Sequence, residues 1–354
     1  MAADERAPED VVTRRMFLYG AAAAQRGGRN RYPGKQWETG TPESAGFDPA
    51  PLEEMVQGLG GRGCVVKDGL AIRTWGDQRE IGDWFSSAKP VLTTFLFFAL
   101  NEGRIKSVDA PVGQFGWNLL PKDSRMTFRH LANMISGYAR PEPPGEAWAY
   151  NDFAIQLYQK TLFDKVFAEP PEQAANHPRR FAFLGLEDGL QFRAANRRIS
   201  ASVRDFARIA WFWLNKGNWN GVQLLPERYF SRYVKPSVRP DLPNSKEGEA
   251  NDYLQIGTYG GSSDQMRQLS PALYGFTWWF NVPDVRNGSG PPWPDTPRDT
   301  FASLGVRGNY AFVFPGMNAL LVSASGNWGK FGPGDPVANR TLRLFMQAAR
   351  RKAS

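Results

Sequence analysis

The sequence predicts an α/β protein of the α+β type, in which an antiparallel sheet is built from N- and C-terminal segments and flanked by helices. Strand-like stretches occur near both ends of the chain, at 63–76 and 309–325, and helical patterns dominate the middle. The chain has 354 residues, 42% hydrophobic and 22% charged, as is typical of a globular protein with a large core. A mainly helical domain is therefore expected as an insertion into a sheet domain.

The length suggests two domains, at about 150 residues for each. We expect residues 31–105 and 250–354 to form the sheet domain and residues 106–249 to form the mainly helical domain. The active site is expected at the interface of the two domains. Residues 1–30 are expected to form a signal-like or disordered tail.

The first distinctive segment is "TRRMFLYGAAAA" at 13–24, where two arginines precede a short apolar run. It looks like a twin-arginine export signal, which would place the protein in the periplasm or outside the cell. The alternative is a disordered tail with a chance arginine pair on a cytoplasmic protein. No stretch reaches the ~18 apolar residues of a membrane span, so stable membrane insertion is not expected.

The next two elements are a hairpin and a buried helix. "GCVVKDGLAIRTWG" at 63–76 has short apolar runs on both sides of the turn dipeptide Asp68-Gly69. Residues 86 to about 101 predict a helix with Ser86 or Ser87 as its cap and Pro90 in its first turn.

The remaining elements are predicted from hydrophobic periodicity and from the turn residues between them. Helical stretches are expected at 126–136, 151–167 and 201–217, and the last carries apolar residues at i, i+3, i+4 and i+7. "YGFTWWFNV" predicts a strand between long loops within 235–300. A second hairpin around Pro315-Gly316 and a terminal helix at 336–351 close the chain.

Composition excludes several kinds of chemistry and partner. The single cysteine, Cys64, rules out an intrachain disulfide, and neither a zinc motif nor a G-x-S-x-G elbow is present beside the two histidines. We therefore expect no metal and no cofactor. Residues 1–35 carry +3 of the formal charge of +8, and no basic run is interleaved with aromatics, so nucleic-acid binding is not expected. A small-molecule substrate is the expected partner.

The segment "FSSAKPVLTTFLFFALNEG" raises a question of placement, because a polar cluster precedes an almost wholly apolar run. A serine in the first turn of a buried helix lies near backbone N–H groups and the positive end of the helix dipole. A lysine three residues later lies on the same face, so the Lys89 amine can reach the Ser86 oxygen. We expect burial to lower the pKa of Lys89 and make it a proton acceptor. The alternative is a capping serine followed by a solvated lysine.

Six segments together resemble the serine β-lactamase and penicillin-binding-protein superfamily, in the branch of class C β-lactamases, D-aminopeptidases and family VIII carboxylesterases. "FSSAKPVLTTFLFFALNEGRIKSVDAPV" resembles the nucleophile helix of that family, and "PGEAWAYND" resembles its tyrosine motif. Between these two lies "MTFRHLANMISGY", and after them come "RISASVRDFARIAWFWLNKGNWNGVQLLPERYF", "YGFTWWFN" and "GNYAFVFPGMNALLVSASGN", so that the six segments occur in the order of the family. The resemblance runs from about residue 37 to 350 and implies that His130 is a packing residue.

The resemblance implies acyl transfer. Ser86 would attack a carbonyl, and Lys89 and Tyr150 would share the proton as general base and then general acid. An adjacent ammonium favours the phenolate form of a tyrosine. The oxyanion hole would combine the backbone N–H of Ser86 with one near Val306.

Two departures from the family pattern bear on the substrate. Asp152 stands where the family usually has Asn; it can accept a hydrogen bond from Lys89 but cannot donate one to a substrate. The alternative role for Asp152 is the N-cap of the following helix. The third motif is expected at Ser303-Leu304-Gly305, which has no cation, and Arg307 two residues further on is a possible substitute.

These features predict a serine hydrolase that cleaves an ester or amide of a small, largely neutral acyl substrate. Alternatives are a β-lactamase or D-Ala-type peptidase, and a catalytically inactive ligand-binding member of the fold. Four aromatic residues are candidates for the cleft lining or the core, namely Trp148, Tyr274, Trp278 and Trp279. The sequence leaves the oligomeric state open.

Overall fold

A computed structural model describes residues 30–349 of the chain. The arginine pair and apolar run at 13–24 lie outside the described residues, as does the predicted end of the last helix at 351. None of the helices within 30–349 is long and apolar enough to cross a membrane.

The centre of the molecule is a seven-stranded antiparallel sheet in the order β2-β1-β12-β11-β10-β9-β8. Its strands come from the two ends of the described chain, and β1 pairs with β12 in a register that sets Cys64 opposite Val322. Their bounds are β1 Arg62–Lys67, β2 Leu70–Trp75, β8 Tyr274–Gly275, β9 Trp278–Phe280, β10 Phe301–Gly305, β11 Asn309–Phe314 and β12 Ala319–Ala324. The predicted sheet of N- and C-terminal segments is confirmed.

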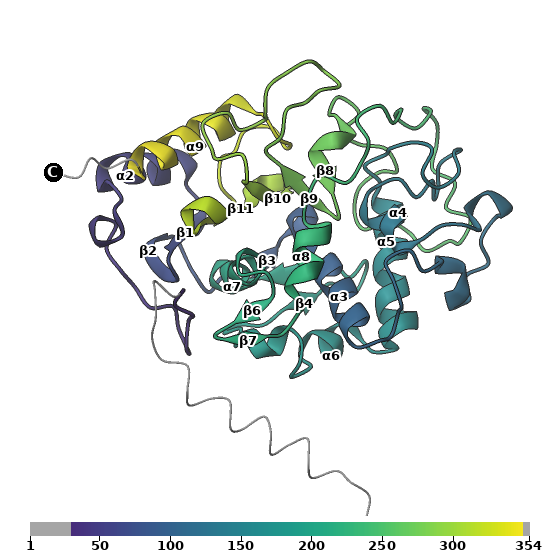
Figure 1. Cartoon of the computed structure of the whole chain (residues 1–354), viewed down its shortest axis with the longest axis horizontal. Coiled ribbons are helices and arrows are strands. Elements are labelled where there is room, and N and C mark those ends of the chain that lie inside the picture. Colours follow the sequence, from purple (N-terminus) through teal and green to yellow (C-terminus); the bar gives the residue numbers. More distant parts are fainter. Residues whose placement is uncertain (1–29, 350–354) are drawn as a thin grey trace, which may run out of the picture.

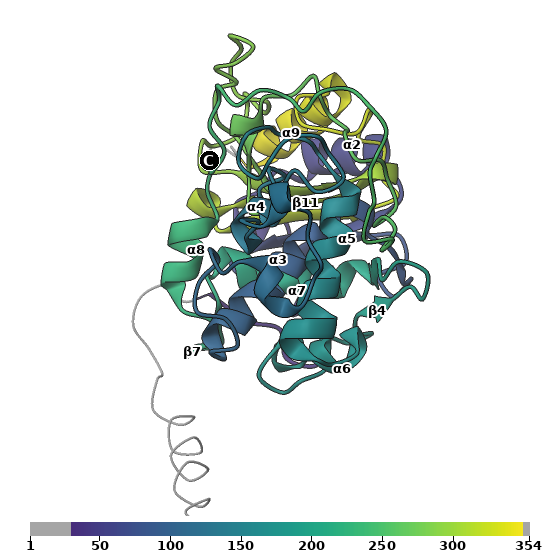
Figure 2. The same ribbon diagram turned by 90° about the vertical axis from the view of Figure 1, so that its right-hand side faces the viewer.

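Both faces of the sheet are covered by helices. Helices α2 (Pro49–Leu59) and α9 (Pro336–Ala348) pack on each other along one face, and α7 (Val203–Leu214) packs against β1, β11 and β12 on the other (Figure 1). Figure 2 shows β11 between these two layers, with α3 (Lys89–Asn101) on the same side as α7.

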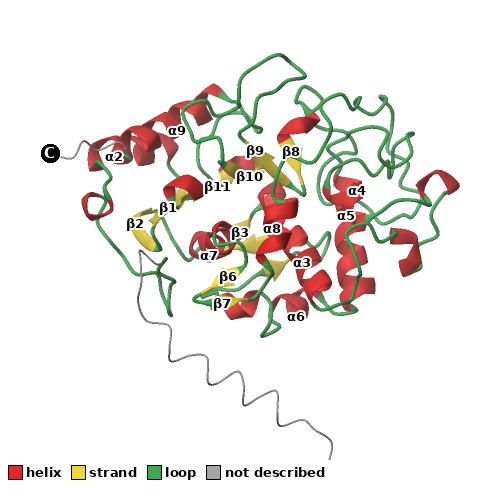
Figure 3. Ribbon diagram, in the orientation of Figure 1, coloured by secondary structure: helices red, strands yellow, loops and turns green. Residues whose placement is uncertain are grey.

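The remaining elements are short. They are β3 Gly82–Asp83, α4 Phe128–Ala132, α5 Asp152–Lys160, α6 Pro171–Ala175, β4 Gln191–Phe192, β5 Ile199–Ala201, β6 Asn218–Trp219, β7 Val222–Gln223 and α8 Glu227–Tyr233. The expected helix at 151–167 is α5 followed by a π-helical turn over Thr161–Phe167. Most of the segment from residue 235 to 300 is loop (Figure 3). The boundaries at 105 and 250 stay a prediction, and α7, which lies between them, packs against the sheet.

Two details differ from the sequence-based expectation. "YGFTWWFNV" is not one strand, because the chain turns at Phe276 and Thr277, whose φ values of 45° and 74° let β8 pair with β9. Neither Ser86 nor Ser87 caps the helix α3, since both lie in a 3-10 turn over Phe85–Ala88 and Ala88 is the N-cap. Pro90 does lie in the first turn, as predicted.

Helix α3 is the most deeply buried helix, because every residue from Lys89 to Ala99 is buried. Its apolar residues surround the whole helix, as expected of a helix without a solvent face. The ring of Phe95 lies 4.9 Å from that of Phe163 and 5.0 Å from that of Phe181, both edge-on. Packing along α3 therefore fixes its first turn, which holds Lys89, and supports the preceding 3-10 turn, which holds Ser86.

Truncating a side chain in this packing should lower the stability of the protein. Phe95 is fully buried, so Phe95→Ala leaves a cavity and should lower the free energy of unfolding by about 3–5 kcal/mol. Urea denaturation measures this change, with Val222→Ala as the control because Val222 is 48% exposed. Equal losses in the two variants would show that the core around α3 does not set stability.

Candidate active site

Lys89 is the centre of the candidate site. Its Nζ lies 2.8 Å from Ser86 Oγ, 3.0 Å from Tyr150 Oη and 2.7 Å from Asp152 Oδ1. The side chain of Lys89 is fully buried and that of Asp152 is 7% exposed, so the ion pair is shielded from water. The structure thus brings together the four residues that the sequence singled out from two distant segments.

The charge state of Lys89 differs from the sequence-based expectation. Burial lowers the pKa of Lys89, as predicted, but attraction to Asp152 and Tyr150 outweighs it and the pKa is raised overall. An ammonium has three donors, and the three oxygen atoms around Nζ match them in number. Lys89 is therefore held in its charged form.

The two residues that begin α5 have separate roles. Asn151 is the N-cap, since its side chain accepts hydrogen bonds from the backbone N–H groups of Phe153 and Ala154. Asp152 is buried and faces Lys89, so its alternative role as the cap is wrong. A neighbour that caps the helix leaves the Asp152 carboxylate free to pair with the lysine.

The strand β10 lies against the turn that carries Ser86. Ser303 is buried, and its Oγ lies 2.8 Å from Ser87 Oγ, so this side chain supports the turn. Gly305 approaches the turn so closely that a Cβ there would lie 2.5 Å from the carbonyl oxygen of Trp84 and 2.8 Å from the backbone nitrogen of Ser87. The expected register of the third motif therefore places it beside the turn that carries Ser86, but Ser303 and Gly305 are absent from the lining of the pocket.

A pocket of about 110 Å³ opens beside Ser86 and Asp152. Ten residues line it: Phe85, Ser86, Asp152, Arg198, Tyr259, Gly260, Gly261, Gln265, Val306 and Phe331. Val306, predicted near the oxyanion hole, is among them, whereas Arg307 is exposed next to it. Within residues 30–349, no group of three or more His, Cys, Asp and Glu side chains is placed to hold a metal ion.

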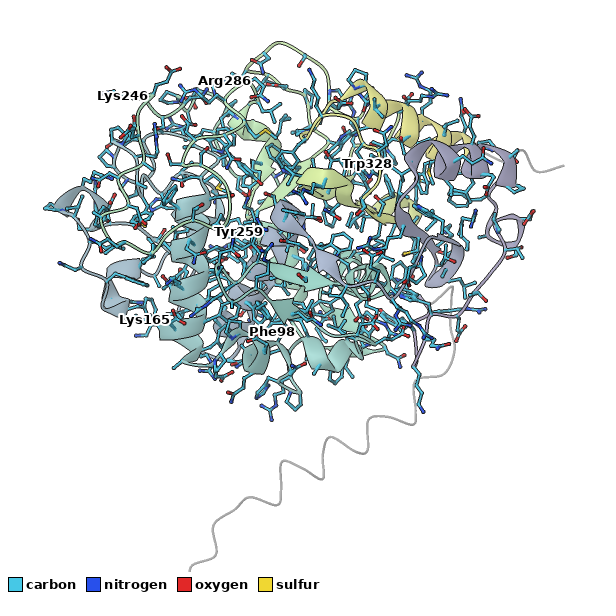
Figure 4. All side chains as sticks on the ribbon, turned by 180° about the vertical axis from the view of Figure 1, so that it is seen from behind. Phe98, Lys165, Lys246, Tyr259, Arg286 and Trp328 are labelled. Carbon is cyan, nitrogen blue, oxygen red and sulfur yellow. The ribbon has the colours of Figure 1, made fainter. Side chains whose placement is uncertain are left out.

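The loop from Tyr259 to Gln265 forms a wall of this pocket that sequence reasoning missed. Its backbone is bound to the start of α5, since Tyr259 N donates to Asp152 O at 3.0 Å and Gln265 N donates to Tyr150 O at 2.9 Å. Figure 4 shows Tyr259 near the middle of the molecule, whereas Lys246 and Arg286 of the same loop region lie at its outer edge. The pair Gly260-Gly261 was the available sequence signal, because a Cβ on Gly261 would lie 2.5 Å from Asp152 Oδ2.

The aromatic residues predicted as candidates for a cleft are core residues. Trp148, Tyr274, Trp278 and Trp279 are each at most 1% exposed, and none lines the pocket. The Trp279 ring stacks at 5.8 Å from that of Tyr150 and helps to fix it. His130 is a structural residue as expected, since its Nδ1 accepts a hydrogen bond from the Thr127 backbone in the cap of α4.

The close approach of Gly305 yields a test of the site geometry. Gly305→Ala should displace the Ser86 turn and lower the free energy of unfolding by about 1–3 kcal/mol, because backbone atoms cannot move aside cheaply. Thermal unfolding measures the loss. Gly290→Ala is the matched control, since a Cβ at Gly290 would meet no atom within 4 Å. An unchanged melting temperature for Gly305→Ala would contradict the packing of β10 on the turn.

Comparisons with known proteins define the fold. No family model matches the chain, and no curated protein matches it by sequence. Among solved structures, a Bacillus anthracis protein described as a 6-aminohexanoate-dimer hydrolase has 17% identity and a TM-score of 0.59, covering 84% of this chain and 81% of its own. A β-lactamase from Mycobacterium bovis has 16% identity and a TM-score of 0.55, covering 84% and 97%. EstCE1, a hydrolase with promiscuous acyltransferase activity, has 12% identity and a TM-score of 0.56, covering 87% and 97%.

These three proteins differ in stated activity but share their architecture with this chain over more than four fifths of its length. The chain therefore has the fold of the serine β-lactamases and penicillin-binding proteins.

Proposed function

We propose that this protein is a serine hydrolase that cleaves an ester or amide of a small acyl substrate through an acyl-enzyme on Ser86. The observation that carries the proposal is the contact of Lys89 Nζ with both Ser86 Oγ and Tyr150 Oη. A nucleophile, a proton-accepting pair and an orienting carboxylate within hydrogen-bonding reach are the components of covalent acyl transfer. Solved structures of the same fold include a protein described as a 6-aminohexanoate-dimer hydrolase and a hydrolase with promiscuous acyltransferase activity.

In the first step the Ser86 hydroxyl gives its proton to the Lys89–Tyr150 pair. The pair can accept this proton only after it has lost one of the protons that it carries when the ammonium and the phenol are both protonated. Lys89, held as an ammonium by Asp152, contacts both Ser86 Oγ and Tyr150 Oη, so a proton can pass between these two oxygen atoms beside it. Ser86 Oγ then bonds to the carbonyl carbon, and the backbone N–H groups of Ser86 and Val306 would stabilise the oxyanion.

The second step breaks the bond between the carbonyl carbon and the leaving oxygen or nitrogen, which takes the proton from Tyr150. Water then attacks the acyl-enzyme and gives a proton to Tyr150. Tyr150 passes this proton to Ser86 Oγ as the bond between Oγ and the carbonyl carbon breaks, which releases the acid and restores the Ser86 hydroxyl. The pocket of about 110 Å³ beside Ser86 suits a small acyl group.

A β-lactamase or D-Ala-type peptidase is the second candidate, because a β-lactamase is among the proteins of the same fold. Ser303, at the expected position of the third motif, is uncharged and buried against Ser87, so it presents no cation to a substrate carboxylate. This observation favours the ester or amide hydrolase.

Covalent labelling tests the nucleophile. Wild-type protein treated with a fluorophosphonate probe should gain the mass of one adduct, and Ser86→Ala should gain none, because the probe needs an activated oxygen. Intact-protein mass spectrometry gives the readout, with Ser87→Ala as a neighbouring-serine control that should still be labelled. Adduct formation with a penicillin would favour the β-lactamase, and no adduct with either reagent would favour an inactive ligand-binding protein.

The pH profile tests the role of Asp152. Its negative charge raises the pKa of Lys89, so the Lys89–Tyr150 pair in Asp152→Asn should lose its proton at a lower pH. The acid limb of kcat/KM should therefore move to lower pH by roughly one to three units. Stopped-flow measurement with an activated ester gives the profile, and a limb that stays in place or moves upward would contradict the charge assignment.

A further inference from the structure

The ring of Phe85 lies at the pocket and close to two guanidinium groups. Arg198 Cζ is 4.7 Å and Arg307 Cζ 5.3 Å from its centroid, both within cation–π range. Phe85 directly precedes Ser86, lines the pocket and is only partly buried. Its φ of 49° is unfavourable for a bulky side chain, so the contacts around the ring hold it in a conformation that it would otherwise leave.

The charges around this ring do not balance. Asp83 Oδ2 pairs with Arg198 at 2.6 Å and with Arg193 at 3.1 Å, so one carboxylate serves two guanidinium groups. Arg307 is exposed, and no Asp or Glu within residues 30–349 forms an ion pair with it. The mouth of the pocket therefore carries an excess of positive charge, whereas Lys89 and Asp152 cancel each other inside it.

Arg307 lies next to the pocket, although it is not among the residues that line it. It follows Val306, which lines the pocket with Ser86, and its Cζ lies 5.3 Å from the ring of Phe85, another lining residue. Its φ of 61° turns the chain sharply after β10. An acyl group attached to Ser86 that extends out of the pocket would pass these residues.

We propose that the site selects acyl substrates that carry a carboxylate on the far end of the acyl chain, with Arg307 as the specificity-determining residue. The inference rests on the proposed function and replaces the neutral acyl group expected from the sequence. Arg307 presents a planar pair of donors that matches a carboxylate, and the ion-paired Arg198 and Arg193 add to the local field. The carboxylate would bind at the mouth beside Phe85, away from the strand position of Ser303.

The test compares two esters of equal acyl length, mono-p-nitrophenyl adipate and p-nitrophenyl hexanoate. The wild-type protein should have the higher kcat/KM for the adipate, and Arg307→Gln should lower the adipate-to-hexanoate ratio about fivefold. Arg307→Lys should retain part of the preference because it keeps the charge but loses the fork. Arg340→Gln on α9 is the matched control, since it removes one exposed charge outside the pocket and should leave both rates unchanged.

The outcomes separate recognition from support of the turn. An equal loss on both esters in Arg307→Gln would assign Arg307 to holding Phe85 and would overturn the proposal. If neither ester is cleaved, the proposed hydrolase fails, and binding of monomethyl adipate to Ser86→Ala, measured by calorimetry, decides the remaining question. Binding that Arg307→Gln abolishes would support the carboxylate site alone, and no binding would overturn it.

Discussion

The geometry of the candidate site depends on the buried ion pair between Lys89 and Asp152. Removing two charges from water is costly, and a buried pair is tolerated only when each remaining polar group is also satisfied. Lys89 meets this condition with three oxygen partners, of which Ser86 and Tyr150 are neutral groups of the proposed chemistry. The contacts that stabilise the buried charge of Lys89 therefore also place the proposed nucleophile and the phenol within reach of each other.

The pair also joins parts of the protein that are otherwise separate. Lys89 begins α3, which is fixed in the core over its whole length, and Asp152 begins α5. The backbone of Asp152 is held on both sides by the loop over α5, through Tyr259 N to Asp152 O and Asp152 N to Ser262 O, each at 3.0 Å. Movement of that loop would act directly on the carboxylate. The loop is thus part of the charge-holding structure as well as a wall of the pocket.

The sequence was informative where local rules apply. The three-residue spacing of Ser86 and Lys89 before an apolar run predicted their contact. The contact forms even though Ser86 lies in the 3-10 turn that precedes α3 and Lys89 begins that helix. The site roles of Tyr150 and Asp152 were predicted from the family resemblance. Local patterns could not place them, because 61 residues separate Tyr150 from Lys89 and no periodicity spans that distance. The predicted direction of the Lys89 pKa shift was wrong, because the prediction considered burial, which lowers the pKa, without the Asp152 carboxylate, which raises it.

The pocket wall could not be predicted for a related reason. Tyr259, Gln265 and Arg198 lie in irregular segments whose contacts are made by backbone hydrogen bonds, and such bonds leave no pattern of residue types. Gly260 and Gly261 are required because a Cβ at either position would collide with Arg198 or Asp152. Only the structure shows these neighbours, so the two glycines alone did not identify the wall.

Aromatic residues on the core side of the site affect its electrostatics. Tyr150 is enclosed by the rings of Trp279, Tyr274 and Phe331, so little water reaches the phenol from the side of the core. Exclusion of water lowers the local dielectric and strengthens the attraction between Lys89 and Asp152. The same enclosure makes any uncompensated charge inside the site expensive. Net positive charge is therefore tolerated at the solvent-facing mouth, around Phe85, while the interior keeps equal numbers of opposite charges.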